Sequence, residues 1–282
     1  MSAVSSTVAA RTALAGLRRG GASPMASSFA TSAAILGLNA LTGILIARTL
    51  GPQGRGELTA ILLWPTLLAS MGFLGLAEAT TFHVSRATAT LGRLAGTSLA
   101  VSVVQSVLLV GVGAVVIPHA LFRYDADVVR TAYVFLLYIP LFFLMNYPLS
   151  LLQGLQRFGS VNVLRLLAFA PTAGGLLGLA LADRLTVETA AFTYLGAYLV
   201  TGVVSAGLLM RAGVIRLSFD LLLTRQLLSF GLRSHTANVS SNLNEWLGQL
   251  VISILLAPVK LGLYVIAVTL TLYFLLRVVT VR

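Results

Sequence analysis

One short stretch, residues 242–249, concentrates side chains able to do chemistry inside an otherwise apolar region. Glu245 is the only acid well inside such a region, and Asn242 and Gln249 share its helical face at spacings of minus three and plus four. An ionised carboxylate within a bilayer costs about 2.5 to 3.5 kcal/mol. We therefore expect Glu245 to be protonated, to pair with a cation or to face a polar cavity, with a structural hydrogen bond to Asn39 as the alternative.

Signatures of enzymes are absent from the sequence. His83, His119 and His235 lie far apart without an HExxH pattern, and neither a P-loop nor a GxSxG elbow occurs. Asp125 and Asp127 resemble the metal-binding acidic pairs of some glycosyltransferases, but a solvated loop between apolar segments explains them better. The chain also has no cysteine. We predict no catalytic residue, no metal and no cofactor.

The elements that must position the polar residues are transmembrane helices. Hydrophobic residues make up 57% of the 282 residues, charged residues make up 10%, and the mean hydropathy is +0.95. Crossing the hydrocarbon core takes roughly 20 apolar residues. Six runs contain no Asp, Glu, Lys or Arg, namely 20–47, 58–77, 94–122, 131–156, 166–182 and 189–210. Residues 234–258 and 261–276 add two more, so we predict an all-α polytopic membrane protein of about eight helices.

The distribution of Lys and Arg predicts the orientation. Thirteen lie on the side of the N-terminus and six on the other, which places the N-terminus in the cytoplasm. Residues 1–27 carry Arg11, Arg18 and Arg19, but the following apolar run exceeds a signal peptide core, so we interpret them as an uncleaved tail. Because the cations are spread over short loops, the net charge of +11 does not indicate nucleic-acid binding.

An internal repeat relates two distant turns. The segment LGPQGRGEL at 50–58 aligns with LAPVKLGLY at 256–264 at an offset of 206, which matches Pro52 with Pro258 and Gly56 with Gly262. Both copies join the end of one span to the start of the next. We expect Pro52 to end the first helix and the nearby glycines to allow a tight reversal. An offset of six helices favours a parallel repeat, as in transporters built from two bundles around a cavity.

Three segments carry a family resemblance. ARTLGPQGRGELTAILLWP at 47–65, GLQRFG at 154–159 and ILLAPVKLGLYVIAVTL at 254–270 resemble the polysaccharide flippase branch of the MOP exporter superfamily. The resemblance implies a location in the bacterial inner membrane, two helical lobes, and movement of undecaprenyl-pyrophosphate-linked oligosaccharide to the outer leaflet, for O-antigen of lipopolysaccharide, capsule or exopolysaccharide. It implies membrane lipid and the lipid-linked oligosaccharide as ligands, with polysaccharide polymerase and glycosyltransferases as further partners.

The sequence departs from this family in two respects. Many relatives carry an Arg and an Asp two residues apart in the seventh helix, where this chain has Trp246 and Gly248. The chain also reaches only two helices into a second lobe. We interpret it as apparently truncated, with a tail at 1–27, a six-helix lobe at 28–210, a cytoplasmic linker at 211–233 and the start of a second lobe at 234–282, and expect it not to transport alone.

The substrate of such a flippase needs cations for its pyrophosphate and hydrogen-bonding groups for its glycan. Candidate substrate-binding residues are Asn39, Arg48, Gln105, Asn146 and Arg165 in the first lobe, and Asn242, Asn244, Glu245, Trp246 and Gln249 in the second. Trp246 could stack on a sugar ring. Snorkelling is the alternative for Arg165, and bridging between helices is the alternative for Asn39 and Asn146.

Two other functional classes fit the same sequence. A cation-coupled drug or metabolite antiporter of the MOP type would need acids within the membrane, and only Glu245 qualifies. A truncated remnant that does not transport is the third class.

The predicted orientation can be tested by labelling, because single cysteines can be introduced without a background. We expect Thr186→Cys to react with an impermeant thiol reagent in intact cells and Ser160→Cys to be protected. The reverse pattern of labelling would overturn the orientation.

Overall fold

The described residues form helices and no strand. The computed structural model describes residues 24–86, 91–211 and 219–280. The helices are α2 (Pro24–Gly72), α3 (Leu76–Arg86), α4 (Leu91–Ala120), α5 (Ala126–Phe135), α6 (Tyr138–Gly154), α7 (Phe158–Leu181), α8 (Val187–Arg211), α9 (Leu221–Leu255) and α10 (Pro258–Thr280). This architecture confirms the all-α prediction.

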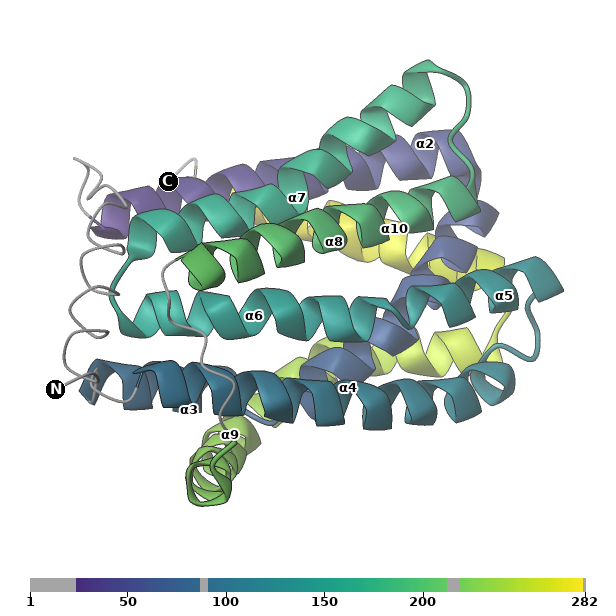
Figure 1. Cartoon of the computed structure of the whole chain (residues 1–282). Helices are drawn as coiled ribbons and strands as arrows, with labels where there is room; N and C mark the ends of the chain where they lie inside the picture. Colours follow the sequence, from purple (N-terminus) through teal and green to yellow (C-terminus); the bar gives the residue numbers. More distant parts are fainter. Residues whose placement is uncertain (1–23, 87–90, 212–218, 281–282) are drawn as a thin grey trace, which may run out of the picture.

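Helices α4, α6, α7 and α8 run back and forth as antiparallel passes, whereas part of α9 is seen end-on (Figure 1). Five segments are long and apolar enough to cross a membrane, namely Met25–Gly72, Leu91–Ala120, Ala126–Gly154, Phe158–Leu181 and Val187–Arg211. The first contains two passes, because α2 bends sharply at Gly51. With α9 and α10 the arrangement agrees with about eight passes. The helix α9 begins at Leu221, so much of the stretch predicted as a linker is helical.

The bend in α2 is centred on Gly51. Gly51 has φ 65° and ψ −175°, a conformation that L side chains rarely adopt. Pro52 starts the second arm of the helix, where its missing N–H and fixed φ are tolerated. Gly54 lies in the first turn of the second arm, where an added Cβ would lie 2.8 Å from the Cβ of Leu50 on the other side of the bend. The expectation that nearby glycines allow the tight reversal therefore holds for Gly51 and Gly54.

Gly56 and Gly262 bring the backbones of α2 and α10 into contact. A Cβ added to Gly56 would collide with the carbonyl oxygen of Pro258, and one added to Gly262 would collide with the carbonyl oxygen of Pro52. Each added Cβ would also lie 3.0 Å from the backbone nitrogen of the other glycine. The contact is reciprocal between residues separated by the predicted offset of 206, as a two-fold relation between parallel repeats requires.

A second backbone contact joins α9 to the opposite end of the first lobe. A Cβ on Gly75, whose φ is 68°, would collide with the carbonyl oxygen of Gly231. Nearby, the rings of Phe82 and Phe230 stack with centroids 4.5 Å apart. The structure thus holds α9 against the short helix α3 that follows the second arm of α2.

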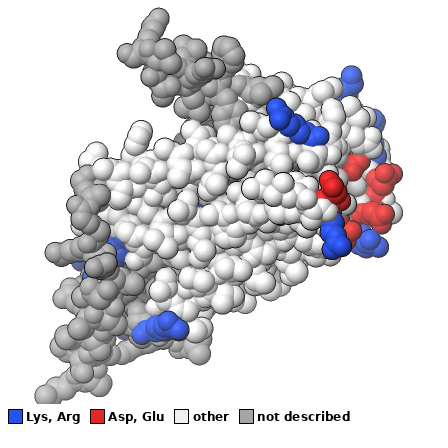
Figure 2. All heavy atoms as spheres, turned by 90° about the horizontal axis from the view of Figure 1, so that it is seen from above, with Lys and Arg blue, Asp and Glu red and all other residues white. Residues whose placement is uncertain are grey.

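Charged side chains gather mainly towards the ends of the bundle on the face that Figure 2 shows, and many large hydrophobic side chains are exposed between the ends. Five of the eight acids belong to turns that meet at one end, namely Glu57, Asp125, Asp127, Asp183 and Glu188. Burial, and then the nearby Glu57 carboxylate, raise the pKa of Tyr124 to about 12, which shows that two of these turns are adjacent. The five acidic side chains therefore offset the positive charge of Lys and Arg at this end. The opposite end of the bundle carries the larger net positive charge.

We expect enlargement of Gly56 to destabilise the protein. Gly56→Leu inserts a side chain where backbone atoms of α10 lie, so the free energy of unfolding should fall by about 1 to 3 kcal/mol or more. The measurement is the thermal midpoint of the purified protein in detergent. Gly37→Leu, on the same helix with no atom within 4 Å of the added Cβ, is the matched control. An equal loss in both variants would contradict the assigned contact.

Candidate functional site

A polar cavity lies where the two arms of α2 meet α8 and α10. Its volume is about 340 Å³. The lining residues are Leu36, Asn39, Thr42, Gly43, Arg55, Tyr194 and Thr269. The first arm and α8 belong to the first six-helix unit, whereas Thr269 comes from α10. The cavity thus lies between the two predicted repeats, which are in contact at Gly56 and Gly262.

Arg55 contacts the hydroxyl of Tyr194 in this cavity. The Tyr194 hydroxyl makes hydrogen bonds with Arg55 and with Thr42. Thr42 Oγ1 also donates to the Leu38 carbonyl oxygen at 3.0 Å. A guanidinium can only donate, so Arg55 donates to Tyr194. Tyr194 thus contacts both Arg55, on the second arm of α2, and Thr42, on the first arm.

This arrangement suits an anionic ligand that also carries hydroxyl groups. Arg55 presents N–H donors that match paired phosphate or carboxylate oxygens. Asn39 offers an amide, and Thr269 offers a hydroxyl oxygen whose hydrogen is donated to the Val265 carbonyl oxygen at 2.7 Å. None of the described residues that line the cavity is acidic. The cavity is therefore equipped to attract negative charge.

The structure places the predicted residues of the first lobe in different environments. Asn39 lines the cavity. Arg48 is exposed near the end of the first arm, outside the cavity lining, and Arg165 is half-buried on α7. Asn146 donates to the Phe142 carbonyl oxygen of its own helix at 2.8 Å. Of these four, only Asn39 lies with Arg55.

Gln105 has a clear structural contact. Its Nε2 donates to the Gly72 carbonyl oxygen at 3.0 Å, where α2 ends before the turn to α3. Its Oε1 accepts from the Tyr147 hydroxyl at 3.0 Å. The Tyr147 ring packs edge to face with Phe73 at a centroid distance of 5.1 Å. The Gln105 amide therefore supplies a hydrogen bond to a backbone carbonyl at the end of α2, because polar groups in hydrocarbon need a partner.

The predicted residues of the second lobe lie on α9. Trp246 and Gln249 are half-buried there. The side chains of Asn242, Asn244 and Glu245 lie outside the described part of the chain, so the role of Glu245 stays a prediction. No group of three metal-ligating side chains occurs among residues 24–86, 91–211 and 219–280.

Sequence reasoning missed Arg55, Thr42, Tyr194 and Thr269 as members of one site. It assigned Arg55 to a loop at the membrane surface, whereas the bend at Gly51 starts a new helix and turns Arg55 into the cavity. One signal was available, because Arg55 immediately precedes the glycine that the repeat matches with Gly262. The tyrosine and the two threonines carry no motif.

The comparison of folds defines the class of protein. The chain is similar to a solved structure described as the inward-facing conformation of a multidrug resistance MATE family transporter of the MOP superfamily, with a TM-score of 0.65 and 16% identity. The match covers 95% of this chain and 61% of that structure, so this chain spans less than two thirds of its length. The chain thus has the fold of a MOP-type transporter.

The family follows from the sequence comparison. Residues 26–280 match the family described as polysaccharide biosynthesis protein, and the chain belongs to that family. This confirms the resemblance found in the sequence. No curated protein sequence gives a significant match.

Removing the Tyr194 hydroxyl should weaken anion binding at Arg55. We expect Tyr194→Phe to raise the dissociation constant for inorganic pyrophosphate several-fold, because a hydrogen bond of about 1 kcal/mol no longer fixes the guanidinium. The measurement is isothermal titration of the purified protein in detergent. Tyr133→Phe removes a hydroxyl that donates to the Ala114 carbonyl oxygen at 3.1 Å away from the cavity, and should leave binding unchanged. Equal binding by both variants would show that Tyr194 does not position Arg55.

Proposed function

We propose that this protein takes part in moving a polyprenyl-pyrophosphate-linked oligosaccharide across the bacterial cytoplasmic membrane for synthesis of cell-surface polysaccharide such as O-antigen. The observation that carries the proposal is Arg55, a cation in a polar cavity between two helical repeats. The polysaccharide biosynthesis family and the MOP-type fold support it.

Each part of this substrate has a matching feature. The pyrophosphate carries paired oxygens that suit the guanidinium of Arg55. The glycan needs hydrogen-bonding groups, which Asn39 and Thr269 supply. The polyprenyl tail remains in hydrocarbon, which the apolar sides of the bundle face (Figure 2). One cavity at the junction of the two repeats can therefore hold the charged end of a lipid.

The absence of acids from the described cavity lining separates this proposal from a cation-coupled drug antiporter. Glu57, the carboxylate closest to Arg55 in sequence, accepts a hydrogen bond from Gln53 at 3.0 Å and does not line the cavity. An antiporter for cations needs a carboxylate in its path. The described part of the cavity offers a cation instead.

The proposal includes a topology and partners. The N-terminus lies in the cytoplasm, residues 28–210 form the first lobe, and residues 234–282 begin the second. The more basic end of the bundle then faces the cytoplasm, as the positive-inside rule requires. Glycosyltransferases would supply the lipid-linked oligosaccharide at that face, and a polymerase would receive it at the other.

Replacement of Arg55 tests the substrate class. The purified protein is incubated with a fluorescent polyprenyl-pyrophosphate trisaccharide, and binding and transbilayer movement are measured in proteoliposomes with an impermeant quencher. We expect Arg55→Gln to weaken binding about tenfold or more, because hydrogen bonds to charged groups contribute about 1.5 to 3 kcal/mol. Arg55→Lys keeps the charge but loses the paired donors, and should bind with intermediate affinity.

The control for this experiment is Arg123→Gln. Arg123 is exposed at the same end of the bundle, with its guanidinium 5.1 Å from the Phe122 ring centroid, and lies outside the cavity lining. It should bind like the unaltered protein. Equal binding by Arg55→Gln and Arg123→Gln would exclude Arg55 as the anion site, and binding of the lipid without its pyrophosphate at full affinity would exclude the substrate class.

A further inference from the structure

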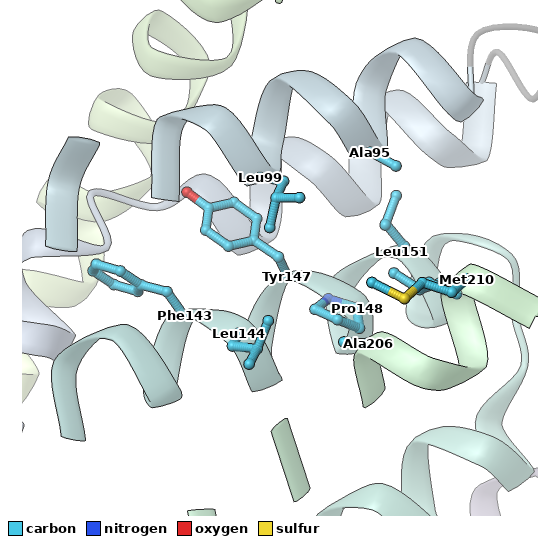
Figure 3. Close-up of a pocket in the computed structure, with 10 residues that line it drawn as sticks. Ala95, Leu99, Phe143, Leu144, Tyr147, Pro148, Leu151, Ala206 and Met210 are labelled. Atoms are coloured by element: carbon cyan, nitrogen blue, oxygen red, sulfur yellow. The ribbon is translucent and has the colours of Figure 1, made fainter. Parts of the chain in front are cut away.

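A second, apolar cavity lies inside the first lobe, with α6 as its floor. It has a volume of about 90 Å³. Figure 3 shows it between α4, α6 and α8, with Ala95 and Leu99 from α4 and Ala206 and Met210 from α8. The floor is formed by Phe143, Leu144, Tyr147, Pro148 and Leu151. The walls α4 and α8 each pack on α6, and hardly on each other, so the cavity is a groove between them.

The groove accepts hydrocarbon and excludes water. Its one polar lining group, the Tyr147 hydroxyl, already donates to Gln105 at 3.0 Å. An apolar cavity without polar partners for water stays dry. Met210 lines the groove and is 66% exposed, so the groove reaches the surface at the end of α8.

Both walls end in an arginine at the same end of the bundle. Arg93 lies two residues before Ala95 on α4, and Arg211 follows Met210 on α8. Both arginines are exposed. The Arg93 guanidinium makes a 3.5 Å ion pair with Asp220, but its side chain remains 62% exposed and keeps free faces for another anion. A ligand seated in the groove would therefore present its surface end to two cations.

We propose that this groove binds an anionic phospholipid of the surrounding leaflet, with part of an acyl chain along α6 and its phosphate at Arg93 and Arg211. The apolar interior matches the chain, and the arginines match the charge of the headgroup. The lipid fills the gap between α4 and α8 and holds both against α6.

This lipid is distinct from the proposed transport substrate. Tyr194 of the Arg55 cavity and Met210 of the groove lie on the same helix, about 24 Å apart along its axis. A pyrophosphate at Arg55 and a phosphate at Arg211 therefore mark opposite ends of the first lobe. The inference goes beyond the proposed function, and lipid binding can succeed or fail independently of it.

Native mass spectrometry of the purified full chain tests the proposal. The protein is transferred from micelles containing equal amounts of phosphatidylglycerol and phosphatidylcholine with identical acyl chains. We expect about thirtyfold preferential retention of phosphatidylglycerol, because two arginines near the surface both attract the anionic lipid. The double variant Arg93→Gln and Arg211→Gln should lose the preference. Ala206→Leu, which fills the groove, should lose retention of both lipids.

Matched variants decide the outcome. Arg225→Gln removes an exposed arginine of α9 that does not border the groove, and Ala170→Leu enlarges an exposed alanine of α7. Both should retain phosphatidylglycerol normally. Equal retention of the two lipids by the unaltered protein, or the same loss in Arg225→Gln as in the double variant, would overturn the site. Displacement of phosphatidylglycerol by an uncharged polyprenol would show that the groove holds the substrate tail instead. Because the two arginines are exposed, the double variant is expected to fold even where Ala206→Leu does not.

Discussion

The approach of two backbones at Gly56 and Gly262 constrains the rest of the structure. Neither residue can carry a side chain, because each would meet the carbonyl oxygen of the proline four positions before the other glycine. Both helices also line the polar cavity, α2 with residues of its two arms and α10 with Thr269. The bend at Gly51 then decides which side chains reach that cavity. Arg55, one turn beyond the bend, is directed inward, whereas Arg48 before it is exposed.

A cation placed in this way is costly unless polar groups surround it. Burial of a guanidinium is tolerated when its donors are satisfied. The Tyr194 hydroxyl accepts from Arg55 and also contacts Thr42. Because Thr42 is anchored on the Leu38 carbonyl oxygen, the position of Arg55 is coupled to the first arm of α2. A change in the angle between the two arms would therefore move or release the guanidinium. Under the proposed function, this coupling links the shape of the cavity to the strength of the anion site.

The sequence predicted the helices well because hydropathy is averaged over long stretches, so a single residue changes it little. The long charge-free runs each correspond to a helical pass, and the offset of 206 predicted a relation that the reciprocal contact of Gly56 and Gly262 supports. Individual roles were harder to predict. A glycine needed for positive φ, such as Gly51, and a glycine needed for close packing between helices, such as Gly56, look alike in a sequence. Likewise, Gln105 was a polar residue in an apolar run, and only the break of α2 at Gly72 explains its amide. Arg55 was read as a surface charge because the direction of a side chain depends on the bend that precedes it.

Helix α8 lines both cavities, one of which is polar and the other apolar. Along α8, Tyr194 faces a polar space between the repeats, and Met210 faces an apolar groove inside the first lobe. Transporters of this architecture work by moving bundles relative to one another, which requires each bundle to remain rigid while the space between bundles changes. A gap between α4 and α8 weakens that rigidity, because packing contacts are lost where no atoms fill the space. Hydrocarbon from the leaflet can restore those contacts without adding any residue to the interface between the lobes. Under the two proposals, lipid in the groove affects the stiffness of the first lobe and the Arg55 cavity affects what the lobe binds, and the roughly 24 Å between them along α8 allows the two properties to vary separately.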